Sequence, residues 1–204
     1  IVIFDPHRAG HETLYYPGET NMLMSDIAVI NKVDSAATDK VNLVRKNIEA
    51  YAPNADIVLA ESAVLVEDAG QIRGKRVLVV EDGPTLTHGG MPVGAGTIAA
   101  TRNEAASIVN PRPYIAGTIK ETFKTYPKIG SVLPAMGYGK QQMHDLENTI
   151  NNADCDLVLF ATPIDLPKLL SINKPTLRVQ YEYRDHGSPT LKKVLLRHLK
   201  KLIK

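Results

Sequence analysis

Short, continuous runs of apolar residues alternate along this chain with longer stretches of helical periodicity. Runs such as Asp26–Ile30, Arg76–Val80 and Asp156–Phe160 are rich in Val, Leu and Ile and are followed by turn signals. Strands of a parallel sheet show such continuous runs, because helices bury both faces of the sheet. The alternation therefore predicts an α/β fold with a doubly wound, mostly parallel, Rossmann-like sheet.

The other expected elements follow the same rhythm. Strands are expected at residues 1–5, 56–59, 107–110, 131–134 and 176–181, and helices at residues 38–51, 96–106, 141–152 and 189–204. The last helix carries Leu191, Val194, Leu195 and Leu199 at helical spacing among lysines. We expect it to dock on the body of the protein and leave a basic face in water, with a membrane surface or a partner as alternatives.

Composition excludes several classes of protein. The 204 residues carry a net charge of +2, and the basic C-terminal stretch accounts for this excess. Aromatic residues make up 5% and there is no Trp, which disfavours nucleic-acid binding. Cys155 is the single cysteine, so a disulfide within the chain is excluded. No apolar run is long enough to span a membrane, and no secretory signal is visible, so a cytoplasmic location is expected.

The string Asn31-Lys32-Val33-Asp34 directly follows the expected strand 26–30. Ligands of open α/β sheets bind at the carboxyl ends of the strands. In this N-K-x-D pattern the Asp34 carboxylate accepts hydrogen bonds from guanine, Asn31 ties neighbouring loops together and the Lys32 stem lies over the base. Ser62 and Ala63, after the next strand, are expected to offer a backbone N–H to guanine O6. These residues predict a GTP site, with ATP as the alternative in which Asp34 only caps a turn.

The phosphate-binding half of such a site is not visible in the sequence. No G-x-x-x-x-G-K-[S/T] loop occurs. The chain also begins abruptly inside an apolar run, Ile1–Phe4. We therefore expect a phosphate loop upstream of Ile1, with residues 1–70 forming the C-terminal portion of a P-loop GTPase-like domain. Residues 71–204 are expected to form a second Rossmann-like region, with the boundary near Gly70–Lys75.

Ionisable residues cluster where the first strand ends. The cluster comprises Asp5, His7, Arg8, His11 and Glu12. Arg8 and the two histidines can neutralise phosphate, and Asp5 or Glu12 can hold Mg²⁺ or carry a proton. These five residues are predicted to be catalytic.

A long glycine-rich segment follows the strand 76–80. Glu81 and Asp82 at its start are predicted to hold Mg²⁺ or to act as an acid–base pair. Glycines let the backbone approach a ligand, and a helix that starts near Thr97 offers free N–H groups to an anion. The predicted anion-binding residues are Thr85, His88, Gly89, Gly90, Gly94, Gly96, Thr97 and Arg112, with Lys140 on the same rim.

Several long strings resemble a known family. They are Asp5-Pro6-His7-Arg8-Ala9-Gly10-His11-Glu12, Tyr16-Pro17-Gly18-Glu19-Thr20-Asn21, Ile30-Asn31-Lys32-Val33-Asp34 and Val80-Glu81-Asp82-Gly83-Pro84-Thr85-Leu86-Thr87-His88-Gly89-Gly90-Met91. The chain resembles the carboxyl-terminal half of predicted P-loop GTPases of the cyclic 2,3-diphosphoglycerate synthetase-like family. The resemblance implies a larger protein with an upstream phosphate loop, an ATP-dependent ligase activity, Mg²⁺ and a small phosphorylated acid as substrate.

The predicted function is therefore a nucleotide-dependent phosphoryl-transfer enzyme or GTPase that acts on a small anionic substrate. Two alternatives stay open. One is an ATP-dependent ligase of the cyclic 2,3-diphosphoglycerate synthetase type, and the other is a GTP switch or metallocentre chaperone without catalysis. A homodimer is compatible with each of them.

Overall fold

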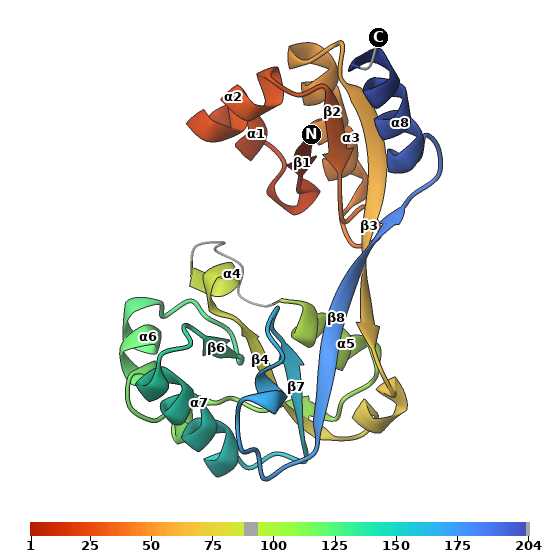
Figure 1. Ribbon diagram of the computed structural model, residues 1–204. Coiled ribbons are helices and arrows are strands. Elements are labelled where there is room, and N and C mark those ends of the chain that lie inside the picture. The colour runs from red at the N-terminus through yellow and green to blue at the C-terminus, as the bar shows by residue number, and fades with distance from the viewer. Residues whose placement is uncertain (88–93, 203–204) are drawn as a thin grey trace. The chain divides into compact units, whose positions relative to one another are not determined.

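The computed structural model describes residues 1–87 and 94–202, without the side chains of Thr85 and Leu202 (Figure 1). The chain forms two compact units. Unit 1 comprises Ile1–Ala63 and Glu182–Lys204, and unit 2 comprises Val64–Tyr181. The expected α/β class with a mostly parallel sheet is confirmed. None of the helices in the described ranges is long and apolar enough to cross a membrane.

Unit 1 is built on a parallel sheet in the order β1 (Val2–Phe4), β2 (Ile27–Ile30) and β3 (Asp56–Val66). In register, Val2 lies opposite Ala28, and Ala28 opposite Ile57. The helices of this unit are α1 (His11–Leu14), α2 (Tyr16–Leu23), α3 (Thr38–Tyr51) and α8 (Leu191–Leu202).

The four residues of β2 explain why its sequence is apolar without interruption. Ala28 and Ile30 pack on one face of the sheet against α2 and α3, where Met22, Val44 and Ile48 are buried. Ile27 and Val29 pack on the other face, with Val194 of α8. Helices thus cover both faces, and the C-terminal helix docks on the sheet as predicted.

Unit 2 is built around β4 (Arg76–Asp82). This strand pairs with β7 (Leu157–Ala161) along one edge and with β5 (Ser107–Ile108) along the other, and its end pairs with β6 (Leu133–Ala135). Strand β8 (Thr176–Asp185) follows β7 in the order. All these pairings are parallel.

The helices of unit 2 are α4 (Gly83–Thr87), α5 (Ala95–Arg102), α6 (Ile119–Thr125) and α7 (Lys140–Asn152). Helix α5 packs against β4 and β7, and α6 packs against α7 (Figure 1). One apolar core joins them, to which α5 contributes Ala99, α6 contributes Phe123 and α7 contributes Ile150. Four 3₁₀ turns complete the chain: η1 (Pro6–Arg8), η2 (Ala69–Ile72), η3 (Arg112–Tyr114) and η4 (Leu166–Lys168).

The structure differs from the sequence-based elements in particular places. The strand expected at 56–59 continues to Val66, so Ser62 and Ala63 lie within β3 and not in a loop after it. The helix expected at 96–106 ends at Arg102, and Glu104 has a left-handed φ of 55° that no helix continues through. Helices α1, α2, α4 and α6 were not expected. Helix α2 buries only Met22, which gives too little apolar periodicity to reveal it.

Candidate functional site

Asp5 and Lys32 meet at the carboxyl ends of β1 and β2. Lys32 Nζ lies 2.7 Å from Asp5 Oδ2, and the backbone N–H of His7 donates to Asp5 Oδ1 at 3.0 Å. Lys32 itself has a left-handed φ of 59°, which is unusual for a residue with a side chain. Such backbone strain concentrates at functional sites. The fold therefore brings together two segments that the sequence singled out separately.

Asp34 connects the same loop to β3. Its Oδ1 accepts a hydrogen bond from the backbone N–H of Ser62 at 3.2 Å, and the N–H of Val33 donates to the carbonyl of Ala60 at 3.1 Å. Two groups that were expected to bind guanine thus bind each other. In this arrangement Asp34 holds its loop against β3, and Ala63 follows as the next residue of the strand.

Two buried polar atoms at this edge have no hydrogen-bond partner among the described residues. They are Asn31 Oδ1 and Arg8 Nε. The backbone N–H of Asn31 ties the end of β2 to the Phe4 carbonyl of β1 at 3.0 Å, and His7 Nε2 lies 3.0 Å from Ser35 Oγ. Buried polar groups are nearly always paired in folded proteins. An unpaired acceptor and an unpaired donor beside Asp5 and Lys32 are therefore consistent with a ligand that supplies both partners.

Glu12 and His11, also predicted to be catalytic, point in different directions. Glu12 is buried, and its two oxygens accept hydrogen bonds from the Gly10 N–H at 2.9 Å and from Asn47 Nδ2 at 2.7 Å. The Glu12 side chain thus fastens the start of α1 to α3. His11 is exposed at the first turn of α1.

Glu81 in unit 2 points inward and not toward solvent. It is 2% exposed, and its Oε1 accepts hydrogen bonds from the N–H of Gly94 at 3.1 Å and of Thr97 at 3.0 Å. Burial raises the pKa of this carboxyl to about 7, against the lowering effect of these N–H groups. The start of α5, predicted as an anion site, thus binds the protein's own carboxylate.

Close packing explains the two glycines at this helix start. A Cβ on Gly94 would collide with the Glu81 carboxylate, and a Cβ on Gly96 would lie 2.6 Å from Val79 Cγ1 and 3.1 Å from Ala161 Cβ. Burial raises the pKa of the Tyr138 phenol, and the charge of Asp82, at the end of β4, adds to this effect. His88, Gly89 and Gly90 lie outside the described residues, as does the side chain of Thr85.

The Arg112 side chain forms hydrogen bonds within unit 2. Its guanidinium donates to the carbonyls of Ile129 at 2.6 Å and Gly130 at 3.2 Å, and it lies 4.6 Å from the centroid of the Phe123 ring. The guanidinium group predicted to bind an anion therefore already donates to backbone carbonyls, which stabilises the fold. Lys140 begins α7.

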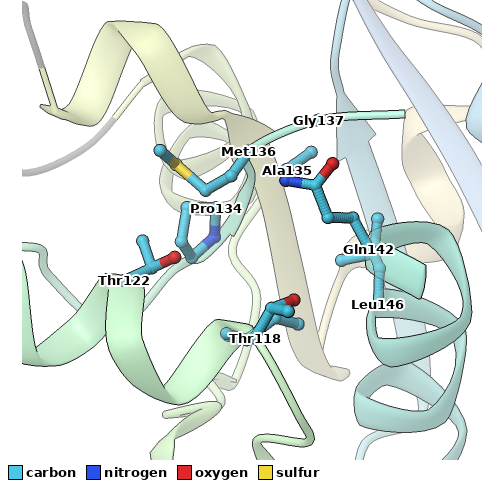
Figure 2. Close-up of a pocket in the computed structure, with 9 residues that line it drawn as sticks. Thr118, Thr122, Pro134, Ala135, Met136, Gly137, Gln142 and Leu146 are labelled. Carbon is cyan, nitrogen blue, oxygen red and sulfur yellow. The ribbon is translucent and has the colours of Figure 1, made fainter. Parts of the chain in front are cut away.

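A small pocket of about 70 Å³ lies where β6 ends, between α6 and α7 (Figure 2). Figure 2 shows Thr118 and Thr122 on one side of it and Gln142 and Leu146 on the other. The Thr118 hydroxyl and N–H both donate to Asp145 Oδ2 at 2.8 Å, which lowers the pKa of that carboxyl. No side chain that lines the pocket is charged. No sequence pattern indicates this pocket, because its lining residues come from separate segments.

Two of the carboxylates predicted to bind Mg²⁺ are already engaged within the fold. Glu12 and Glu81 are both buried and engaged by N–H groups, whereas Mg²⁺ keeps several waters and binds exposed oxygens. Within residues 1–87 and 94–202, no three His, Cys, Asp or Glu side chains are grouped as metal ligands.

One pair of residues at the unit 1 edge was missed from the sequence. His186 Nδ1 lies 2.7 Å from Glu61 Oε1, across a separation of 125 residues. A histidine without a local partner pattern is more often a surface residue than part of a site. No local pattern reveals the pair, because the segment after β8 comes close to β3 only in the folded chain.

The chain is similar over nearly its whole length to a known synthetase. Arginine synthetase ArcE of Thermococcus kodakarensis is 54% identical over 195 residues, which cover 96% of this chain and 44% of the relative. The chain thus spans less than half the length of the protein that it matches. No protein-family model matches the chain.

Proposed function

We propose that this chain is part of an ATP-dependent synthetase that forms arginine, and that unit 1 contributes to its nucleotide site. The similarity to arginine synthetase ArcE supports a synthetase and its product. The observation that carries the nucleotide site is the convergence of Asp5, Lys32 and Asp34 at the carboxyl edge of β1–β3, where parallel α/β sheets bind ligands.

Arginine carries a carbon bonded to three nitrogens, so its synthesis from a ureido group replaces a C–O bond with a C–N bond. Oxygen leaves readily only after a phosphoryl or nucleotidyl group has been attached to it, which is what ATP supplies. Such group transfer depends mainly on positioning and charge neutralisation. In this proposal the charges of Arg8 and Lys32 face the phosphates, and Asn31 Oδ1 accepts a hydrogen bond from the nucleotide.

The choice of ATP over GTP departs from the first prediction. Guanine recognition was inferred from the N-K-x-D string. In the structure, however, Asp34 Oδ1 accepts a hydrogen bond from the Ser62 N–H. Asp34 then acts as an anchor of the loop, as in the alternative prediction of an ATP-dependent ligase. We assign no residue of this chain to Mg²⁺, which would accompany the nucleotide phosphates.

Calorimetry on the longest natural polypeptide that contains this chain tests the proposal. ATP, ADP and GTP are each titrated into the protein in the presence of Mg²⁺. Arginine formation from ammonium and the ureido analogue of arginine is followed by amino-acid analysis. We expect ATP to bind in preference to GTP and arginine to form only with ATP. Lys32→Ala should weaken ATP binding at least about tenfold, whereas Lys40→Ala, at an exposed position of α3, serves as the matched control.

Preferential binding of GTP, without ATP-dependent arginine formation, would overturn the proposal. Slow GTP hydrolysis without a small-molecule product would favour the GTP switch instead.

A further inference from the structure

The His186–Glu61 pair fixes which nitrogen of the imidazole ring carries a proton. Glu61 Oε1 lies 2.7 Å from His186 Nδ1, and a carboxylate only accepts hydrogen bonds. Nδ1–H is therefore the donor. In the neutral ring Nε2 then keeps its lone pair and is an acceptor. The described residues provide no partner for this Nε2.

Glu61 lies on β3 beside the proposed nucleotide site, and His186 directly follows the end of β8. Along one edge of β3, the Ala60 carbonyl and the Ser62 N–H bind Val33 and Asp34 of the loop after β2. Along the other edge, the Leu59 carbonyl accepts a hydrogen bond from the His186 N–H at 2.9 Å. The end of β3 in unit 1 is thus flanked by the Asp34 loop and by His186.

The turn that carries His186 is held in place. Asp185 Oδ1 accepts hydrogen bonds from Tyr183 Oη and from the N–H of Leu191, both at 2.7 Å, which connects the end of β8 to the start of α8. The His186 and Glu61 side chains are 52% and 30% exposed, so a ligand can reach the ring. A fixed and accessible acceptor is what recognition of a donor group requires.

We propose that His186 determines base specificity by accepting a hydrogen bond from the 6-amino group of adenine at Nε2. The inference rests on the proposed nucleotide site. Guanine and hypoxanthine present a carbonyl oxygen at this position, so two acceptors would face each other. A site built to bind a donor rejects an analogue that lacks it, because its polar group is left unpaired. Glu61 is a positioning residue that acts through His186.

The test compares ATP with purine riboside 5′-triphosphate, which lacks only the amino group, by calorimetry with Mg²⁺ on the same natural polypeptide. We expect the unaltered protein to bind ATP about five- to tenfold more tightly than the analogue, as one hydrogen bond predicts. His186→Ala should weaken ATP binding by a similar factor and change binding of the analogue less than about twofold. His144→Ala, at an exposed position of α7, is the matched control and should change neither.

Glu61→Ala tests positioning with a separate readout. Nitrogen-15 NMR of the His186 ring should show Nδ1 protonated in the unaltered protein and a shift toward protonated Nε2 in the variant. Discrimination between ATP and the analogue should fall with it. A merely structural role of Glu61 would leave the ring protonation unchanged.

Equal weakening of both nucleotides by His186→Ala, or no weakening of ATP, would overturn this inference while ATP binding still supports the proposed function. Absence of ATP binding by the unaltered protein would overturn the proposed function and the inference together.

Discussion

The backbone N–H of Ser62 donates a 3.2 Å hydrogen bond to Oδ1 of Asp34. This contact joins the loop after β2 to the middle of β3, and it pairs two groups that guanine would otherwise occupy. A carboxylate that anchors a loop and a carboxylate that reads a base respond differently to the same substitution, so the two roles are separable.

Asp34→Asn is expected to leave nucleotide preference unchanged. The amide oxygen of Asn still accepts the Ser62 N–H, so the loop stays anchored. If Asp34 instead read guanine, the amide would favour xanthosine nucleotides. Competition of ATP, GTP and XTP for the Asp34→Asn protein distinguishes these roles, and a gain in XTP binding would contradict the anchor.

Glu81 should make unit 2 less stable as pH rises. Its pKa is about 7 in the folded protein against an ordinary value of 4.5, so between these values the folded state holds a proton that the unfolded state has released. The free energy of unfolding therefore falls from about pH 4.5 to about pH 7, by about 3 kcal/mol in total.

Glu81→Gln keeps an acceptor for Gly94 and Thr97 but does not titrate, so this pH-dependent loss should disappear. Urea unfolding at about pH 5 and about pH 8 measures the difference between the two proteins. Glu121→Gln, which alters an exposed ion pair with Lys124, is the control. An identical pH dependence in the Glu81→Gln protein would refute the assignment.

Gly96→Ala should destabilise the protein by about 1–3 kcal/mol, because the added Cβ would lie 2.6 Å from Val79 Cγ1 in a packed core. Gly70→Ala is the matched substitution, since no atom lies within 4 Å of its Cβ. Denaturant midpoints of the two variants check the difference. Equal midpoints would show that α5 does not pack this closely on β4.

Val194→Ala should lower the free energy of unfolding by about 2 kcal/mol, since Val194 is 1% exposed and packs against Val58 and Ala60. Leu199→Ala, on the same helix but 49% exposed, should cost less than about 0.5 kcal/mol. Thermal unfolding of both variants measures the contrast. If the Leu199 variant were the more damaged, α8 would not dock through its Val194 face.

Much of the fold was predictable because burial requires apolar residues at a regular local spacing in the sequence. A strand covered on both faces must be apolar at every position, as β2 is. A helix that packs on the sheet must carry apolar residues about one turn apart, as α3 carries Val44 and Ile48. Local turn chemistry likewise placed Asp5 and Lys32 after strands. That these two would lie at one edge followed from parallel pairing, and the structure brings them into contact.

Apolar periodicity and turn residues were sufficient to predict the α/β class, most strand positions and the segments that follow the strands at the carboxyl edge of the sheet. The contacts that those segments make depend on the folded chain. Glu81 points into the start of α5, Asp34 binds Ser62, and His186 meets Glu61. The reason is physical: apolar periodicity depends on neighbours within a few residues, whereas the partner of a polar side chain depends on the register of segments far apart in the chain.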